Sequence, residues 1–563
     1  MAYISASSKW FYRGEGNRTL VISNPQTQKV LRLQKSNVAS TDQTNSAQDS
    51  SGKAAEKLRL ELEKSIKLYQ EVFTPLLGAQ YVEHGAIVEL PGEFMANIKD
   101  LVTSANTNRP KHRLNKEVNG QNKYGILMPD FCFVPSGDGI NANEASRPTF
   151  CVEIKPKCGT MPACKGLESG EYKDVKQSVC KYCLFQWTKV YKDEKYLQRS
   201  GYCPLDLFSS DIRRVWYALT CLLNNPQNNF RIFQDGNMMY SGETMAPSCG
   251  SMVESETTEQ APSTMGSNEH HLHLSKLEEF LSHSFLDSTQ DMLTNHNVCG
   301  EKNGSNMQST TVFLATLLQL LIYDSNENTV GCGNGSNHHP SKHPVCLASQ
   351  YHEADCMTGT IPAYMMSKGL TFAQGGVLKK ILDVQRLDDV GTDEAFCIFN
   401  NLYAIGVKDM IDLHIFAWNE SQCSVNANEN TNANPRNVQI NANYDQVHAN
   451  INYKGKITDC CITNGNSLAH VNKHSVTSKL DSLTKFLIAA SANDCSIMIS
   501  FQEVIGPLAN SNCFRDLLTG RVYKYSIAIV DLDQKLADRI PKYYKEYNDI
   551  IDNYLSFKNN VEL

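Results

Sequence analysis

Short apolar runs separated by glycines and polar turns open the chain. Residues 8–35 contain two or three such runs, and the last of them, 30–35, alternates apolar and polar side chains. This pattern predicts two or three β-strands with a glycine-containing hairpin. The polar stretch 36–53 predicts a flexible loop. Apolar positions recur at helical spacing over 54–76, which predicts an amphipathic helix.

Strand-length and helix-length patterns alternate through the rest of the chain. Strands are predicted around 86–90, 126–134, 150–155, 496–501 and 525–530, and helices over 175–190, 206–223, 478–492 and 537–555. Three stretches, 243–271, 324–345 and 419–452, contain too few apolar residues to offset the entropy of ordering, so we expect disordered insertions there. The predicted fold class is α+β, with a strand-rich first part and a helix-rich second part.

The length and the charge narrow the class of protein. A chain of 563 residues is too long for one compact core, so two or more domains are expected. The formal charge of −7 gives no indication of a nucleic-acid or membrane partner. Any site for a polyanion must therefore be a local basic pocket on an acidic body.

The 19 cysteines and the first residues bear on the compartment. The chain opens without a basic segment followed by an apolar one, and no run of about 18 apolar residues occurs, so neither a secretory signal nor a membrane span is expected. Irregularly spaced cysteines in such a chain are typical of reduced thiols, and we expect a cytoplasmic or nuclear protein.

Two features of the first strands suit a phosphate site. The hairpin Arg13-Gly14-Glu15-Gly16-Asn17-Arg18 places glycines where backbone N–H groups approach phosphates closely, although such a hairpin is more often a plain turn. Arg32, one strand later, lies where nucleotide kinases place a phosphate-pairing cation. A solvated cation on a strand face is an equally good interpretation of Arg32.

The segment Glu153-Ile154-Lys155-Pro156-Lys157-Cys158-Gly159 is more specific. In an extended backbone, Glu153, Lys155 and Lys157 point to one face, and Pro156 keeps the backbone extended between the lysines. An exposed edge strand would carry these charges without any function, but it would not explain the ending Pro-Lys-Cys-Gly. A polyanion site is the better interpretation.

This segment resembles the signature of the inositol-pentakisphosphate 2-kinases, and further blocks match that family in the same order. They are 12–21, 30–35, Thr74-Pro-Leu-Leu-Gly78, 182–189, Cys203-Pro-Leu-Asp-Leu-Phe-Ser209, Pro226-Gln-Asn-Asn-Phe-Arg231, 494–502 and Asp531-Leu-Asp-Gln-Lys535. The resemblance implies a two-lobed fold distantly like protein kinases, with a β-rich N-lobe over 1–127 and a larger mixed α/β C-lobe over 128–563. It implies transfer of phosphate from ATP, with Mg²⁺, to the 2-hydroxyl of inositol pentakisphosphate. We expect a monomer.

The resemblance also implies roles for individual residues. Gly14, Glu15, Gly16 and Asn17 would cover the ATP phosphates, Arg32 would replace the usual kinase lysine, Met128 and Asp130 would meet the adenine, and Glu153 would lie on the ATP side. Lys155 and Lys157 would face the inositide, together with Arg113, Lys189, Asn228, Asn229, Arg231, Lys535, Arg539 and Tyr543. The last three are spaced i, i+4, i+8, as on one helical face.

Two carboxylates complete the implied site beside Lys155. Asp531 ends an apolar strand and would be a magnesium ligand. Asp494 would orient or deprotonate the 2-hydroxyl and share a metal. Without the family match, Asp531 would be interpreted as a helix cap and Asp494 as a turn residue.

The sequence departs from the family where some members hold a structural zinc. Cys460 and Cys461 are adjacent, so they are poor chelating partners, and zinc is not predicted. Cys180 and Cys183 are interpreted as packed thiols at helical spacing. Asp533 is either a second metal ligand or exposed, and exposure is favoured.

Two alternative functions remain open from the sequence. The chain is either a kinase acting on another position or another inositol phosphate, or a non-catalytic scaffold that binds inositides. The presence of both Asp494 and Asp531 argues against a degraded, non-catalytic kinase.

Overall fold

The computed structural model describes most of the chain outside several loops. The described residues are 4, 9–16, 18–37, 47–104, 109, 113–114, 116–118, 122–135, 147–165, 167–192, 196, 198–242, 267–285, 308–322, 346–349, 360–368, 375–404, 406, 411–412, 414–416, 473–505 and 513–561. Within them the fold is mixed α and β, with two antiparallel sheets.

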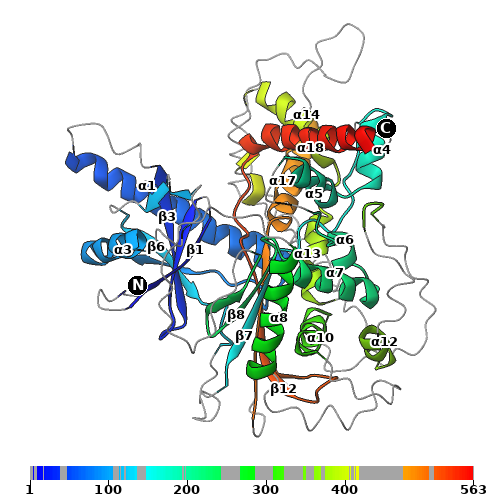
Figure 1. Cartoon of the computed structure of the whole chain (residues 1–563). Helices are drawn as coiled ribbons and strands as arrows, with labels where there is room; N and C mark the ends of the chain where they lie inside the picture. Colours follow the sequence, from blue (N-terminus) through cyan, green and yellow to red (C-terminus); the bar gives the residue numbers. More distant parts are fainter. Residues whose placement is uncertain are drawn as a thin grey trace, which may run out of the picture.

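The first sheet is built from the N-terminal part of the chain and lies apart from the second (Figure 1). Its strands, in the order β1-β2-β3-β6-β4, are Phe11–Glu15, Thr19–Asn24, Lys29–Asn37, Tyr124–Pro129 and Ala86–Glu89, and β5 (Lys116–Val118) pairs with β3. Leu31 and Leu33 of β3 pack into one apolar cluster with Phe94 and Ile98 of helix α3 (Gly92–Ser104). Because side chains alternate along a strand, Arg32 points to the opposite face.

The second sheet lies in the larger part of the molecule and forms the floor of the site. Its strands, in the order β11-β12-β10-β7-β8-β9, are Cys513–Arg515, Val522–Val530, Ser496–Glu503, Thr149–Ile154, Phe230–Gln234 and Asn237–Tyr240. Phe150 of β7 stacks on Phe501 of β10 and meets Phe285 and Phe313 edge-on, so helices cover this face of the sheet. The site residues lie at the end of β7, β10 and β12 away from that aromatic cluster.

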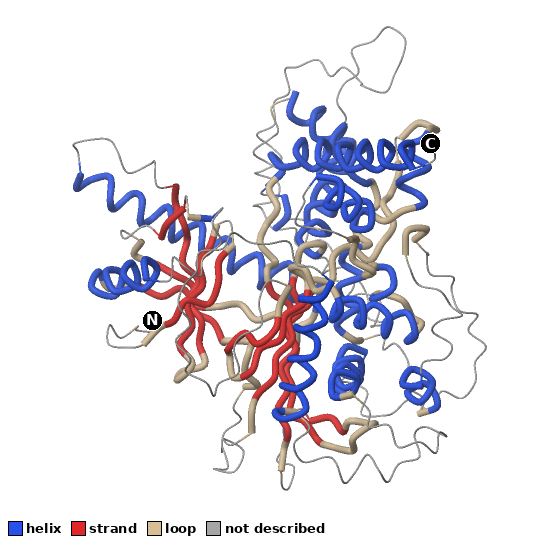
Figure 2. Tube along the Cα trace, in the orientation of Figure 1, coloured by secondary structure: helices blue, strands red, loops and turns tan. Residues whose placement is uncertain are grey.

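Helix α1 (Ala47–Leu68) packs against β4 and β6 of the first sheet, and the helices other than α1 and α3 lie in the larger part of the molecule, on one side of the second sheet and beyond one end of it (Figure 2). These are α2 (Thr74–Leu77), α4 (Glu171–Ser178), α5 (Lys181–Lys192), α6 (Pro204–Leu207), α7 (Ile212–Asn224), α8 (Ser267–Ser284), α10 (Ser309–Ile322), α12 (Thr360–Ser367), α13 (Val377–Gln385), α14 (Gly391–Ala404), α17 (Lys473–Ala492) and α18 (Ile540–Val561). The π-helix η2 (Tyr69–Phe73) continues α1, and the 3-10 helix η6 (Ala537–Arg539) precedes α18.

Several sequence predictions need adjustment. The predicted helix 175–190 is two helices, α4 and α5, because Val179 between them is extended. The predicted loop 36–53 overlaps two regular elements, since β3 runs to Asn37 and α1 begins at Ala47. The expected insertion 243–271 gives way to α8 at Ser267, while 324–345 and 419–452 lie outside the described residues. Within the described part of the chain, no helix has the length and apolar character needed to span a membrane.

Candidate active site

Glu153 lies at the centre of a row of side chains that crosses the second sheet. The β7–β8 register places it opposite Arg231, and the β7–β10 register places it opposite Met498. Arg231 Nη1 is 2.9 Å from Glu153 Oε2, and Lys155 Nζ is 3.5 Å from Oε1. The signature carboxylate is therefore held between two cations that come from different parts of the chain.

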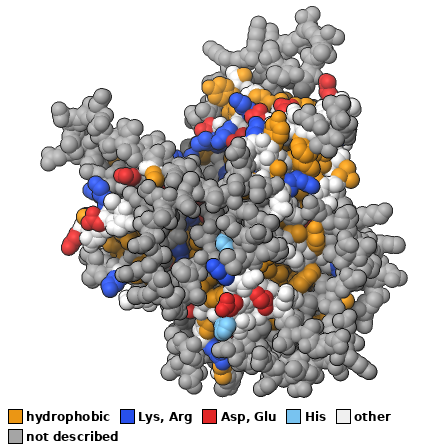
Figure 3. All heavy atoms as spheres, in the orientation of Figure 1, with side chains coloured by type: hydrophobic (Ala, Val, Ile, Leu, Met, Phe, Trp, Pro, Cys, Tyr) orange, Lys and Arg blue, Asp and Glu red, His pale blue; other side chains and the backbone are white. Residues whose placement is uncertain are grey.

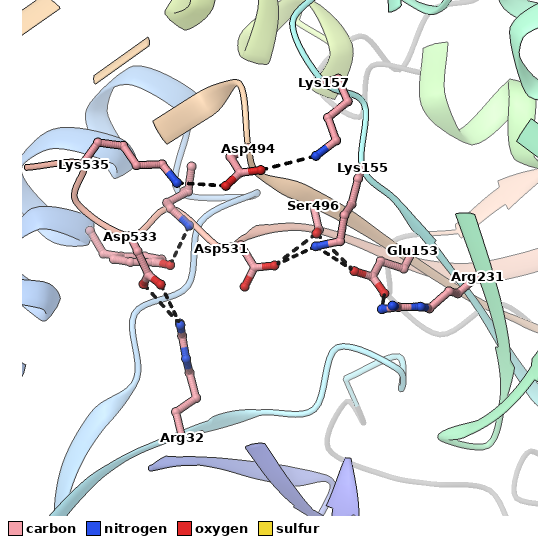
Figure 4. A network of polar contacts seen from close by, with 12 residues as sticks. Arg32, Glu153, Lys155, Lys157, Arg231, Asp494, Ser496, Asp531, Asp533 and Lys535 are labelled. Atoms are coloured by element: carbon pink, nitrogen blue, oxygen red, sulfur yellow. Dashed lines mark hydrogen bonds and ion pairs between the residues drawn. The ribbon is translucent and has the colours of Figure 1, made fainter. Parts of the chain in front are cut away.

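Asp531 follows β12 and approaches the same group (Figure 4). Its carboxylate is 3.3 Å from Lys155 Nζ, and Ser496 Oγ is 3.2 Å from Asp531 and 3.1 Å from Glu153. Burial lowers the pKa of Lys155, but Glu153 and Asp531 outweigh it and the net pKa is raised. Lys155 is therefore a permanent cation between two carboxylates.

Asp494 is the centre of the second cluster of the site, and it lies two residues beyond the end of α17. Lys157 Nζ is 3.3 Å from its Oδ1, and Lys535 Nζ is 2.9 Å from its Oδ2. Burial raises the pKa of Asp494, but the two ammonium groups outweigh it, so the net pKa is lowered. Asp494 is therefore a carboxylate at neutral pH, with a lysine on each oxygen.

The backbone that carries Lys155 and Lys157 is shaped by close contacts. Tyr202 Oη donates to the Pro156 carbonyl at 2.6 Å, and the Lys155 N–H donates to the Asn229 carbonyl at 2.8 Å. Lys157 adopts a left-handed conformation with φ of 62°. A Cβ on Gly159 would lie 2.1 Å from the Phe208 ring, so only glycine fits at the end of the signature.

Arg32 reaches this region from the first sheet. Its Nη2 is 3.2 Å from Asp533 Oδ1, although the Asp533 side chain stays 56% exposed, as the sequence favoured. Burial lowers the pKa of Arg32, but Asp533 and neighbouring groups outweigh this effect, so the net pKa is raised. Arg32, Tyr69 and Met128 line a cavity of about 530 Å³ between the first sheet, α1 and the segment that follows Asp531.

The Glu15 side chain of the glycine hairpin is engaged within the protein, and the predicted cover of phosphates by this hairpin stays a prediction. The Glu15 carboxylate is fully buried in ion pairs with Lys35 and with Arg109, whose Nε is 2.7 Å away. These cations hold the carboxylate in the protein, so its side chain is not available to cover phosphates. Gly14 lies within β1, paired with Val21 where the register with β2 shifts, and Gly16 lies in the turn, where its N–H donates to the Thr19 carbonyl at 2.8 Å. Asn17 lies outside the described residues.

Asp130 lies at the end of β6 and is also engaged within the protein. Its carboxylate accepts hydrogen bonds from Arg13 Nη2 at 3.1 and 3.2 Å and from the Cys132 N–H at 3.0 Å. The Arg13 guanidinium lies 5.2 Å over the ring of Phe233. Asp130 thus ties the glycine hairpin to the connection between the sheets, and its predicted contact with adenine stays a prediction.

The remaining predicted inositide residues make contacts within the protein. Lys189 Nζ is 2.5 Å from Gln227 Oε1, beside Asn228, while the Asn229 side chain is buried and donates to Tyr182 Oη. Arg113 lies on the segment held by Arg109, which donates to its carbonyl.

The predicted helical face of Lys535, Arg539 and Tyr543 is wrong in one respect. Lys535 precedes η6 in an extended segment, so the three residues do not share one helix. Burial raises the pKa of Tyr543, while the charges of Lys535 and Arg539 act to lower it, so both cations still influence this hydroxyl. Figure 3 shows Lys and Arg side chains gathered near the start of α18.

Four buried cysteines form a cluster that the sequence did not predict. The sulfurs of Cys180, Cys183, Cys203 and Cys346 lie within 4.8 Å of one another. Cys180 and Cys203 Sγ are 3.9 Å apart, close to the roughly 3.8 Å that a tetrahedral zinc with Zn–S bonds of about 2.3 Å requires. The Cys180 N–H also donates to Cys346 Sγ at 3.4 Å. The donor set fits zinc, and the pair Cys180 and Cys183, interpreted from the sequence as packed thiols, is joined by two cysteines from distant segments.

Comparison with known proteins identifies the family. Residues 12–548 match the model of the inositol-pentakisphosphate 2-kinase family, and the chain belongs to that family. It is 26% identical to the inositol-pentakisphosphate 2-kinase of Danio rerio over 547 residues, which cover 97% of this chain and 93% of that protein. The Arabidopsis thaliana protein of that name is 29% identical over 42% of this chain and 54% of its own length. The Drosophila melanogaster protein is 27% identical over 41% and 48%.

Proposed function

We propose that this protein transfers the γ-phosphate of ATP to the 2-hydroxyl of inositol 1,3,4,5,6-pentakisphosphate, giving inositol hexakisphosphate. The observation that carries the proposal is the convergence of Lys155, Lys157 and Lys535 on Asp494 and Asp531. These residues come from three segments that are far apart in the sequence, and they form adjoining ion pairs at one end of the second sheet. Family membership gives the reaction class.

The two sheets are proposed to belong to two kinase-like lobes, 1–127 and 128–563. The ion pair between Arg32 and Asp533 and the adjacent cavity lie where such lobes would enclose a nucleotide. Arg32 is a permanent cation, so it suits a place beside the ATP phosphates.

The lysines suit the charge of the proposed acceptor. Each phosphate carries about −1.5 to −2 at neutral pH, so five phosphates carry roughly eight to ten negative charges. Lys157 and Lys535 are paired with Asp494 in this structure, and a bound inositide would compete for both ammonium groups. Losing these partners would raise the pKa of Asp494 toward its ordinary value and make it a better proton acceptor for the 2-hydroxyl.

Asp531 and Asp494 are proposed to hold Mg²⁺. Carboxylate oxygens are the ligands that this ion prefers, and Asp531 leaves its strand in a left-handed conformation that turns its side chain toward Lys155. When bound, the ion would neutralise charge on the ATP phosphates. Lys155 would add a fixed positive charge beside the same carboxylate.

The direct test is incubation of the full chain with ATP, magnesium and a panel of inositol phosphates, with the products separated by charge. Conversion of the pentakisphosphate to the hexakisphosphate is expected. Phosphorylation of a lower inositol phosphate instead would favour a kinase of different specificity. Binding of the pentakisphosphate without turnover would favour a scaffold.

The pH profile should depend on Lys535. The lysine helps to lower the pKa of Asp494, so Lys535→Gln should raise that pKa and move the acid limb of kcat/KM to higher pH. Comparison with wild type on the same substrate cancels the substrate's own ionisations. Lys542→Gln, at an exposed lysine on α18, is the matched control. An acid limb that stays in place would remove Asp494 as the proton acceptor.

We infer that the four-cysteine cluster holds a structural zinc. The purified chain should contain one equivalent of zinc by mass spectrometry, and Cys183→Ser should lose most of it and lower the midpoint of thermal unfolding. Cys513→Ser, at a partly exposed cysteine outside the cluster, should keep the metal. Zinc-free protein whose unfolding midpoint does not respond to added zinc would contradict this assignment.

A further inference from the structure

The side chain of Gln385 connects the backbone near Lys157 to the backbone near Asp494, the two residues of an ion pair in the site. It is the last residue of α13, and its side chain is 1% exposed. Its Nε2 donates to the Lys157 carbonyl at 2.8 Å and to the Ala492 carbonyl at 3.4 Å, while its Oε1 accepts from the Gly159 N–H at 2.8 Å. One amide thus forms hydrogen bonds to both ends of the turn Lys157-Cys158-Gly159, called the signature turn below, and to the end of α17.

The signature turn needs such support. The left-handed region is strained for a residue other than glycine, and Lys157 has φ of 62°. The two hydrogen bonds from Gln385 hold the backbone on either side of Cys158 while it takes this course. In a continued strand, Lys157 would project beside Lys155, whereas here it reaches Asp494 and Lys155 reaches Asp531.

The hydrogen bond from Gln385 to the Ala492 carbonyl positions the backbone that leads to Asp494. Ala492 is the last residue of α17, and Asp494 follows two residues later, with its N–H bonded to the Ser491 carbonyl. Gln385 therefore touches the backbone beside the cation and the backbone beside the carboxylate. A change in its side chain would alter the relation between Lys157 and Asp494 without removing either group.

We propose that Gln385 is a positioning residue that sets Lys157 against Asp494 for the inositide. This inference rests on the proposed function of the site. Gln385 is buried, so it acts through the backbone and does not touch substrate itself. The competing explanation is that Gln385 is a core amide that contributes only to folding.

Gln319 offers a matched control for the folding contribution. It is 3% exposed in α10, where its Nε2 donates to the Ala315 carbonyl and to Asp516, and its Oε1 accepts from the Leu517 N–H at 2.8 Å. The two glutamines thus have the same chemistry and similar burial. Gln319 packs among the helices that cover the second sheet rather than at the signature turn.

The experiment compares Gln385→Met with Gln319→Met, because methionine keeps the shape of glutamine and removes its hydrogen bonds. Both variants should unfold at lower temperature. Only Gln385→Met should raise KM for inositol pentakisphosphate, at least about tenfold, with kcat reduced and KM for ATP within about twofold of wild type. Equal thermal losses with wild-type KM values in both variants would overturn the proposal and leave a core amide.

Gln385→Glu is the second variant, and it decides the matter if Gln385→Met does not fold. It keeps an acceptor for the Gly159 N–H and loses the donor to the Lys157 carbonyl, so an intermediate rise in KM is expected. A wild-type KM for Gln385→Glu would contradict the positioning role. Calorimetric binding of inositol pentakisphosphate without ATP tests the positioning role separately from the kinase function.

If the wild-type protein shows no turnover, the kinase function is rejected. Weaker binding of inositol pentakisphosphate by the Gln385 variants than by wild type would still support the positioning role.

Discussion

Asp531→Asn should abolish phosphoryl transfer, with kcat reduced by about a thousandfold or more. The substitution removes the charge that pairs with Lys155 and the proposed magnesium ligand, while asparagine tolerates the φ of 62° that Asp531 adopts. Inositide binding should be largely spared, because Lys157 and Lys535 pair with Asp494 instead. Single-turnover kinetics and calorimetric binding measure the two effects separately.

Asp549→Asn, at an exposed position on α18, is the control for this change and should leave kcat as in wild type. Collapse of inositide binding in Asp531→Asn would instead make Asp531 a structural residue. It would then serve as the strand-end carboxylate that its sequence position alone suggests.

Lys155→Ala should abolish phosphorylation of inositol pentakisphosphate in a protein that still folds. The side chain is 20% exposed and lies between Glu153 and Asp531. After removal of the lysine, Glu153 still has Arg231 and Ser496 as hydrogen-bond partners, so the substitution should not unfold the protein. The site loses the cation that offsets two carboxylates where the phosphates of both substrates would meet, and kcat/KM should fall by about a thousandfold.

The control for Lys155→Ala is Lys165→Ala, an exposed lysine further along the same connection that pairs with Asp389. It should retain wild-type turnover. Circular dichroism and thermal unfolding verify that both variants are folded. Full turnover by Lys155→Ala would reject the assignment of this pocket to phosphoryl transfer.

The parts of the site that the sequence could predict are those with local signals. The signature segment alternates charge with apolar residues at the end of β7 and beyond it, and Asp494 and Asp531 each adjoin an apolar strand. The pattern predicted the strands, and the resemblance assigned the two carboxylates to the site. The strands 86–90, 150–155, 496–501 and 525–530 were predicted to within a few residues for the same reason.

The parts that could not be predicted depend on partners distant in the chain. Nothing near Glu15 in the sequence shows that Lys35 and Arg109 enclose its carboxylate. Cys346 is far from Cys180 in the sequence, so their spacing gives no chelating motif. Gln385 and Ser496 are ordinary polar residues in helical and strand patterns, and only their contacts give them a role.

The two acidic residues of the proposed chemistry lie just beyond the last pair of the β10–β12 ladder, Ser496 opposite Val530, at the same end of both strands. Neighbouring antiparallel strands keep a fixed separation of about 5 Å, so strand pairing sets the spacing of the two backbone segments that carry these carboxylates. Surface loops elsewhere in this protein can therefore lengthen or shorten during evolution without changing the geometry of the site. Related chains of very different length should then differ little at this pair.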